Sequence, residues 1–326
     1  MLWALSLVTF FLSAALDNLT TCIVMAAVLK KMIKDKNDLW LFASMIIISA
    51  NAGGAWSPIG DVTTIMLWIG GQITATNIIT QIFFPSLVAA LIPLIIFSIK
   101  MKGSIVYEYT NSEDTDKTDQ RVSAFEKYLV FTTGIAALLF VPIFKTITHL
   151  PPFMGILFGL SIIWILTEIL HKKKNDEHRR SLSISGIIER IDTPSILFFL
   201  GILMAVAALQ TAGHLTQLSG ILDKNFNSVY VIDGLIGIFS SIIDNVPMVA
   251  ATMGMYSIDV HSVDSTFWEL LAYCAGTGGS ILIIGSAAGV AIMGIFKIDF
   301  VWYFKNISIT ALIGYLFGII TYIVLN

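Results

Sequence analysis

The chain has 326 residues, of which 56% are hydrophobic and 13% are charged, and its mean hydropathy is +0.84. Soluble domains carry roughly 25% charged residues, so this composition excludes a soluble fold. The net charge of −3 is small and the basic residues lie in loops, so no nucleic-acid partner is expected. The chain is predicted to be an all-α, polytopic membrane protein in contact with lipid, because only helices satisfy the backbone of such apolar segments there.

In chain order, the apolar segments are predicted to form two repeats joined by a loop at residues 100–124. The first repeat, residues 1–99, is expected to contain a hairpin at 2–29, a broken helix at 39–70 and a helix at 78–99. The second repeat, residues 125–326, is expected to begin with three scaffold helices and then to contain the same three kinds of element. These elements are the scaffold helices 125–149, 152–170 and 193–212, the hairpin 229–256, the broken helix 266–296 and the helix 301–325.

The basic loops predict how the segments are oriented. Positive loops stay cytoplasmic, which places the 100–124 loop in the cytoplasm and the chain, as a multi-pass protein, in the inner (plasma) membrane. The region 257–266 contains no Lys or Arg, so it is expected outside, and a re-entrant hairpin at 229–256 is favoured over a full span. The loops used in this argument lie between Lys30 and Asp38, between Lys100 and Lys127, and between His171 and Asp192.

Two motifs occur twice and define the repeat. Asp244-Asn245 follows Asp17-Asn18 by 227 residues, and the glycine-rich stretch that begins at Gly278 follows the one that begins at Gly53 by 225 residues. Two motifs in the same order and at nearly the same separation argue against chance. Transporters are often built from inverted repeats, and the predicted topology opens the first hairpin to the inside and the second to the outside.

Helix-breaking and polar residues inside the apolar segments predict two ion sites. Broken helices at membrane depth are tolerated only where they line a polar cavity. An intramembrane carboxylate marks an ion or proton pathway, and a carboxylate that exchanges a proton for Na⁺ or Li⁺ performs antiport. The first predicted site contains Asp17, Asn18, Thr20 or Thr21, Asn51 and Ser57, with backbone oxygens near Gly53 and Gly60. The second contains Asp244, Asn245, Thr277, Ser280 and Ser286.

Three further interpretations stay open at this point. Asp17 and Asp244 would, in the competing interpretation, only cap the helices that follow them. Asp61 is either a further cation ligand or the cap of a helix that starts at Val62. Carboxylates near segment ends are expected at solvated or pore-mouth positions, namely Glu168, Asp192 and Asp233.

Other potentially reactive residues do not predict an enzyme. Cys22 and Cys274 lie inside apolar segments without metal-binding spacing, so both are interpreted as packing residues. His149, His214 and His261 are expected at the outer surface, where a histidine can respond to pH. No cofactor is expected, and the transported ions are predicted to be Na⁺ or Li⁺ and H⁺.

Four stretches of the sequence carry a resemblance to a known family: Leu16–Thr21, Ala50–Thr64, Met66–Gln72 and Ile243–Pro247. They resemble the motifs of the NhaD-type sodium/proton antiporters of the ion transporter superfamily, and the resemblance covers essentially the whole chain. It implies a homodimer that exchanges Na⁺ or Li⁺ for H⁺ by an elevator-like shift of a hairpin-bearing transport domain against a scaffold, with Asp17-Asn18 and Asp244-Asn245 as the coordinating pairs. Members of the family have scaffold helices before the first hairpin, so this chain is expected to be truncated at its N-terminus.

Two other functions are kept as alternatives. A Na⁺-coupled citrate or dicarboxylate carrier of the same architecture would bind substrate carboxylates at the hairpin tips. Such relatives usually have Ser-Asn-Thr where this chain has Asp-Asn, and an added carboxylate repels an anionic substrate. The second alternative is a truncated remnant without transport activity.

Overall fold

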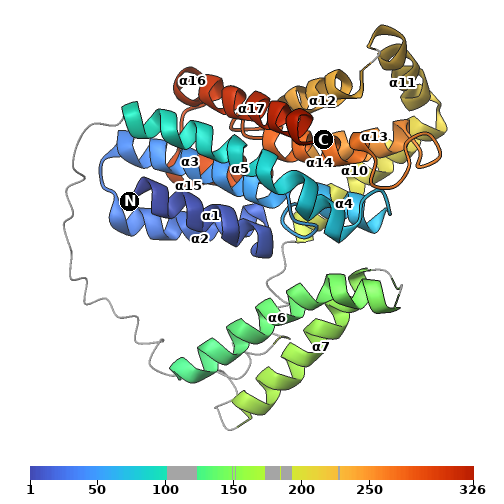
Figure 1. Cartoon of the computed structure of the whole chain (residues 1–326). Helices are drawn as coiled ribbons and strands as arrows, with labels where there is room; N and C mark the ends of the chain where they lie inside the picture. Colours follow the sequence, from blue (N-terminus) through green and yellow to red (C-terminus); the bar gives the residue numbers. More distant parts are fainter. Residues whose placement is uncertain (101–122, 149, 151, 173–183, 185–192, 227) are drawn as a thin grey trace. The chain divides into compact units, whose positions relative to one another are not determined.

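The structure is a computed structural model that describes residues 1–100, 123–148, 150, 152–172, 184, 193–226 and 228–326 (Figure 1). These residues form helices and turns, and no strand occurs among them, so the predicted all-α architecture is confirmed. Most of the predicted loop at 100–124 and of the basic loop before Asp192 lies outside the described residues. In chain order the elements are α1 (Leu2–Leu16), α2 (Asn18–Met32), α3 (Lys36–Ala55), α4 (Val62–Ile69), α5 (Ala75–Lys100), α6 (Ala124–Thr148), α7 (Pro152–His171), α10 (Thr193–Thr211), α11 (His214–Asn225), α12 (Val229–Ile243), α13 (Asn245–Met255), α14 (Thr266–Gly278), α15 (Ala287–Phe296), α16 (Phe300–Tyr303), the π-helical turn η2 (Phe304–Ser308) and α17 (Ile309–Leu325).

The chain divides into two compact units, one of residues 1–107 with 201–326 and one of residues 108–200. In the second unit α6 and α7 pack together, with Gly159 of α7 against Ala137 of α6. Both helices expose large apolar side chains, such as Phe131 and Leu157. Exposed apolar surface of this kind is typical of helices that contact lipid or another protein.

Five segments of the described chain are long and apolar enough to cross a membrane, which fits a multi-pass membrane protein. The helices α1 and α12 have 15 residues each, or about 22 Å, which is shorter than the roughly 30 Å hydrocarbon core. A re-entrant position for the two hairpins therefore stays a prediction that their length allows. The five segments are Lys36–Ala55, Ala75–Lys100, Phe125–Lys145, Phe153–His171 and Phe300–Leu325.

The central elements of the first unit are α3 and α14. Every residue of Phe42–Ala55 in α3 and of Phe267–Gly278 in α14 is buried, as expected for helices surrounded by other helices. The two helices meet near their C-terminal ends, where a Cβ added to Gly276 would lie 3.1 Å from Cβ of Ala55. Both broken helices are therefore interrupted at the centre of this unit.

The elements α1–α4 and α12–α15 share the same local structure. A single residue separates the helices of each hairpin, Asp17 in the first and Asp244 in the second. In the first half the Ser13 hydroxyl donates to the Ala50 carbonyl at 2.6 Å, and in the second half the Ser240 hydroxyl donates to the Ala275 carbonyl at 3.2 Å. These bonds fasten each hairpin to the central helix beside it, and their positions correspond under the repeat.

Equivalent glycines also let each hairpin approach its central helix closely. A Cβ added to Gly53 would lie 2.1 Å from the Phe10 carbonyl oxygen, and one added to Gly278 would lie 2.2 Å from the Gly237 carbonyl oxygen. The repeat predicted from the motifs is thus accompanied by repeated geometry. Its inversion across a membrane stays a prediction.

One described helix was not predicted, because residues 213–228 were left between segments. The helix α11 is short and amphipathic, and Leu215 is its main buried apolar residue. Leu215 packs against Gly254 of α13, so tertiary contact rather than apolar length stabilises this helix. The predicted helix 301–325 lies within the continuous helical segment Phe300–Leu325, in which η2 forms a π-helical turn between α16 and α17.

Candidate functional site

Asp61 lies at the break between α3 and α4 and is 1% exposed. Its Oδ2 accepts a hydrogen bond from Asn18 Nδ2 at 2.7 Å and another from Asn245 Nδ2 at 3.2 Å. Its Oδ1 accepts from the backbone N–H of Thr63 at 2.9 Å. Asn18 begins α2 and Asn245 begins α13, so one buried carboxylate joins the two hairpins.

Asn51 of α3 extends this arrangement into the second half of the chain. Its Oδ1 accepts from Asn18 Nδ2 at 3.0 Å, and its Nδ2 donates to the hydroxyl oxygens of Ser280 at 2.9 Å and Ser286 at 3.0 Å. The Asn51 side chain is fully buried. Six residues are connected in this way, and we call them the Asp61 network: Asn18, Asn51, Asp61, Asn245, Ser280 and Ser286.

The Asp61 network unites two sets of residues that the sequence placed at separate sites. Asn245, predicted for the second site, donates to Asp61, and Asn51, predicted for the first, donates to Ser280 and Ser286. Asp61 caps α4, as one of its two interpretations predicted, and it also accepts hydrogen bonds from the two hairpin amides. Whether the network binds a cation stays a prediction.

Helix termini give the Asp61 network a fixed electrostatic environment. Asn18 and Asn245 are the first residues of α2 and α13, while Asp61 and Ser286 are the N-caps of α4 and α15. A helix N-terminus carries roughly +0.5 of an elementary charge. Four helix N-termini therefore contribute side chains to one network, and the N-terminus of α4, which Asp61 caps, favours a negative charge there.

The remaining predicted ligands lie beside this network and use their polar atoms locally. Asp17 accepts from the backbone N–H of Thr20 at 2.8 Å and from its hydroxyl at 2.7 Å, and Asp244 accepts from the Val246 N–H at 3.4 Å. These are the contacts of helix caps. The competing interpretation of Asp17 and Asp244 is thus consistent with the geometry.

Ser57 and Thr277 also bond to nearby backbone. The Ser57 hydroxyl donates to the Ala14 carbonyl and the Thr277 hydroxyl to the Tyr273 carbonyl, both at 2.6 Å. Thr277, Ser280 and Tyr315 line a cavity of about 10 Å³, counted as the space open to the centre of a water molecule. This is close to the smallest space that holds one water molecule, and it lies directly beside the Asp61 network.

The backbone at the two hairpin tips is strained. Asp17 has φ 74° and ψ 159°, and Asp244 has φ 82° and ψ 139°. Backbone conformations with positive φ and extended ψ are essentially restricted to glycine, and they cost of order 1–3 kcal/mol for other residues. Two non-glycine residues at equivalent positions are held in this conformation, and such strain is concentrated at functional sites.

The strain predicts an order of stability for two variants of one hairpin tip. Asp244→Gly and Asp244→Ala both remove the carboxylate, but only glycine adopts the tip conformation without strain. We expect the glycine variant to be more stable by about 1–2 kcal/mol after its larger unfolded-state entropy is subtracted. Thermal unfolding in detergent measures the difference. Glycine is also better than alanine as an N-cap, so the same pair of substitutions at Asp299, which caps α16 with φ −73°, measures that capping difference alone. A preference for glycine at Asp244 no larger than the one at Asp299 would contradict strain.

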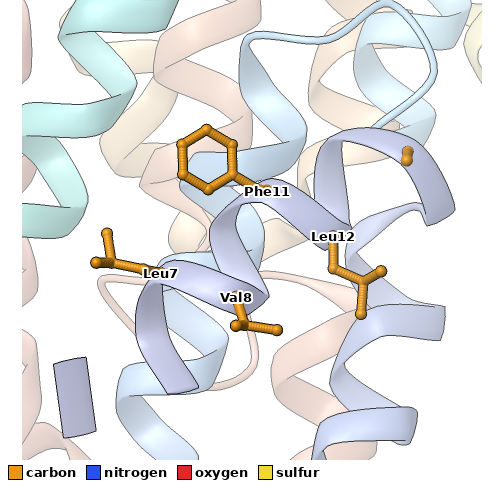
Figure 2. A pocket seen from close by; sticks show the side chains of 5 residues that line it. Leu7, Val8, Phe11 and Leu12 are labelled. Carbon is orange, nitrogen blue, oxygen red and sulfur yellow. The ribbon is translucent and has the colours of Figure 1, made fainter. Parts of the chain in front are cut away.

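A hollow on the outer face of α1 is a different kind of surface. Figure 2 shows Leu7, Val8, Phe11 and Leu12 projecting from this helix, and Ala15 completes the lining. Its side chains offer no polar atom to an ion. The hollow is therefore a surface for lipid or protein and not a continuation of the Asp61 network.

Two acidic residues within the described segments were missed or misplaced by the sequence analysis. Glu269 is buried at the start of α14 and accepts hydrogen bonds from Asn77 and Tyr322, so it joins α14 to α5 and α17. Asp233, expected at a solvated position, is 0% exposed. That expectation was wrong because Asp233 lies on the face of α12 that packs inside the protein.

His261 lies in the turn before α14, and its ring stacks on Phe267 with a centroid separation of 4.1 Å. Burial lowers the pKa of His261, and the charge of Asp223 acts in the opposite direction. Its predicted response to pH is thus displaced towards lower pH. His149 lies outside the described residues.

Comparison with known proteins shows which family the chain resembles. A family model described as a citrate transporter matches residues 1–271. The chain is 47% identical to a sodium/proton antiporter 1 and 46% identical to a sodium/proton antiporter 2, both of Arabidopsis thaliana, with all of this chain aligned. It is 31% identical over 99% of its length to a Na⁺/H⁺ antiporter NhaD of Vibrio cholerae. The chain spans 56%, 77% and 70% of the length of these three relatives.

Proposed function

This chain belongs to the family of the NhaD-type sodium/proton antiporters, and we propose that it exchanges Na⁺ or Li⁺ for H⁺ across the inner (plasma) membrane. The observation that carries the proposal is the Asp61 carboxylate, buried and bonded to the first residue of both hairpins. An ionisable group inside a membrane protein is expensive and marks an ion pathway. The proposed transport site is therefore the Asp61 network.

The network offers the oxygen atoms that an alkali cation needs. In the arrangement described, the amide nitrogens of Asn18 and Asn245 face Asp61. Turning either amide by half a turn exchanges its nitrogen for its oxygen. Amide oxygens, the Asp61 carboxylate and the hydroxyl oxygens of Ser280 and Ser286 would then surround one cation, beside the C-terminal ends of α3 and α14.

Exchange follows from competition at the same carboxylate. A bound cation favours the ionised form of Asp61, whereas in its absence burial favours the protonated form. A proton and a cation thus exclude each other at one group. This competition at Asp61 couples the movement of the cation to that of the proton. It needs no other ionisable group and no enzymatic step.

The proposed transport domain contains the two hairpins and the two broken helices. The Asp61 network links α2, α3, α13 and the breaks before α4 and α15 by hydrogen bonds, so these elements are expected to move together. A shift of this domain against a scaffold would expose the site alternately to the two sides. The resemblance implies that two copies of the chain form the working dimer.

Transport of citrate or another dicarboxylate is the second candidate, because the matching family model is described as a citrate transporter. The buried charge of Asp61 opposes it, since a carboxylate repels an anionic substrate. Such a carrier would need the positive charge of bound cations to hold its substrate. The two candidates therefore differ in whether cation movement requires a carboxylate substrate.

Everted vesicles from cells that express the chain test both candidates. We expect NaCl or LiCl to dissipate an imposed pH gradient at alkaline pH, while choline chloride has no effect. Citrate uptake is followed in the same vesicles, with vesicles lacking the chain as the control. Absence of Na⁺- or Li⁺-dependent dissipation in vesicles with verified expression would refute antiport, and Na⁺-dependent citrate uptake would favour the carrier.

A further inference from the structure

Asp233 is a second buried carboxyl group, separate from the Asp61 network. It lies on α12, 11 residues before the hairpin tip at Asp244, or about 16 Å along the helix. It is 0% exposed, and among the described residues neither of its carboxyl oxygens has a hydrogen-bond partner. An isolated ionised carboxylate in such a place is strongly disfavoured, so the group takes up a proton instead.

Among the described residues, no positively charged group interacts with Asp233. The titratable groups that interact with its charge are Cys274 of α14, Tyr315 of α17 and Tyr256 after α13. The Tyr315 hydroxyl donates to the Gly234 carbonyl at 2.8 Å, and the Tyr256 hydroxyl donates to Asp223 at 2.9 Å. Both hydroxyl protons are thus already in use, and no ion pair of Asp233 occurs in the described part of the chain.

These surroundings suit a proton better than a metal cation. A hard cation needs several oxygen ligands, whereas the groups that interact with Asp233 are a thiol and two hydroxyls already engaged elsewhere. No group of three or more His, Cys, Asp and Glu side chains that could hold a metal ion occurs among the described residues. A proton needs only the carboxylate itself.

The equivalent position in the first half of the chain shows which property belongs to Asp233 alone. Ser6 of α1 precedes Asp233 by 227 residues, the same offset as between the two hairpin tips. Ser6 is also buried, and its hydroxyl oxygen has no hydrogen-bond partner within the described segments. The two halves therefore share a buried polar position on the first hairpin helix, but only the second half carries an ionisable group there.

We propose that Asp233 is a proton-binding site of its own, and that its proton stabilises the contact between α12 and α14. The protonated form favours the docked state, so docking is strongest at low pH and weakens as the pH rises and Asp233 releases its proton to water.

Infrared spectroscopy of the full chain in lipid tests the proton directly. At neutral pH we expect a C=O band of a protonated carboxylic acid that is absent from both Asp233→Asn and Asp233→Ser, the second of which copies Ser6. Asp299→Asn, which changes an exposed helix cap, should leave the band unchanged. A band of equal intensity in wild type and Asp233→Asn would overturn the inference.

Alkylation of Cys274 tests the coupling to docking. Cys274 is fully buried, and its carbonyl lies under Gly237 of α12, so loss of docking exposes it. Relative to Asp233→Asn, which mimics the protonated form, wild-type Cys274 should react equally at low pH and several-fold faster at alkaline pH. The missing negative charge in Asp233→Asn would by itself ease ionisation of the Cys274 thiol. That effect would make the variant react faster than wild type, so it cannot produce the expected result. If the alkylation rate of Cys274 in wild type equals that in Asp233→Asn at every pH, the coupling is overturned.

Neither measurement depends on transport. Absence of cation exchange, with the infrared and alkylation results as expected, would refute the proposed function and leave the proton site standing. Normal exchange together with an unchanged infrared band would refute the proton site alone. The two failures are therefore distinguishable.

Discussion

Replacing Asp61 by asparagine is expected to abolish cation exchange in everted vesicles. The substitution keeps the shape of the side chain but removes the negative charge that would hold the cation. A cation and a carboxylate 4 Å apart attract each other by about 4 kcal/mol at an effective dielectric constant of 20, which corresponds to a loss of affinity on the order of 1,000-fold. The measurement is Na⁺- and Li⁺-dependent dissipation of a pH gradient over a range of cation concentrations.

Matched variants show whether the loss is specific to the site. Asp35→Asn makes the same change at an exposed carboxylate that caps α3, and it should leave exchange unchanged. Asp17→Asn and Asp244→Asn keep an oxygen for the helix cap, so normal exchange in either variant would support a capping role only. Full exchange by folded Asp61→Asn would remove Asp61 from the mechanism.

Substituting alanine for Gly53 or Gly278 is expected to cause a large loss of folded protein. The added Cβ would lie 2.1 Å from the Phe10 carbonyl oxygen in the first case and 2.2 Å from the Gly237 carbonyl oxygen in the second. Both neighbours are backbone atoms, so the helices themselves must move apart. Overpacking of this kind typically costs 1–3 kcal/mol and occasionally more, and we expect about 3 kcal/mol here. Thermal unfolding and the monodisperse fraction in detergent measure the effect.

The control for the two glycines is Gly220→Ala in α11, where no heavy atom lies within 4 Å of the added Cβ. Alanine in an open helical position is better by up to about 1 kcal/mol, so this variant should be at least as stable as wild type. Wild-type stability of Gly53→Ala or Gly278→Ala would show that the hairpins do not need the close approach. Loss of stability in both variants would show that each half of the chain depends on the close approach of its hairpin to its central helix.

The close approach also explains why the predicted breaks fall where they do. The hydrogen bond from Ser13 to the Ala50 carbonyl, like that from Ser240 to the Ala275 carbonyl, forms only where a hairpin helix lies against the central helix. Just beyond these contacts the central helices end and the chain turns to present Asp61 and Ser286. Packing of the hairpins thus positions the polar ends of the broken helices.

The sequence by itself determined the helical segments and their interruptions, because both depend on local properties. The segment predicted at 193–212 lies at Thr193–Thr211 in the structure, since the apolar length of a membrane helix is visible residue by residue. Asp17 and Asp244 were recognisable because an acidic residue inside an apolar segment is costly. The helix α11 was not recognisable, since its short apolar face is stabilised by contact with α13.

Only the tertiary structure decided which polar groups meet. Asp61 is 43 residues from Asn18 and 184 residues from Asn245, and Asn51 is 235 residues from Ser286. The sequence therefore placed these residues at two sites and left Asp61 between two interpretations, whereas packing of α3 against α14 joins them in one network. Packing also buried Asp233, which its place near a segment end had suggested was solvated. Local pattern shows where a helix breaks, but the neighbours of that break depend on how distant helices pack against one another.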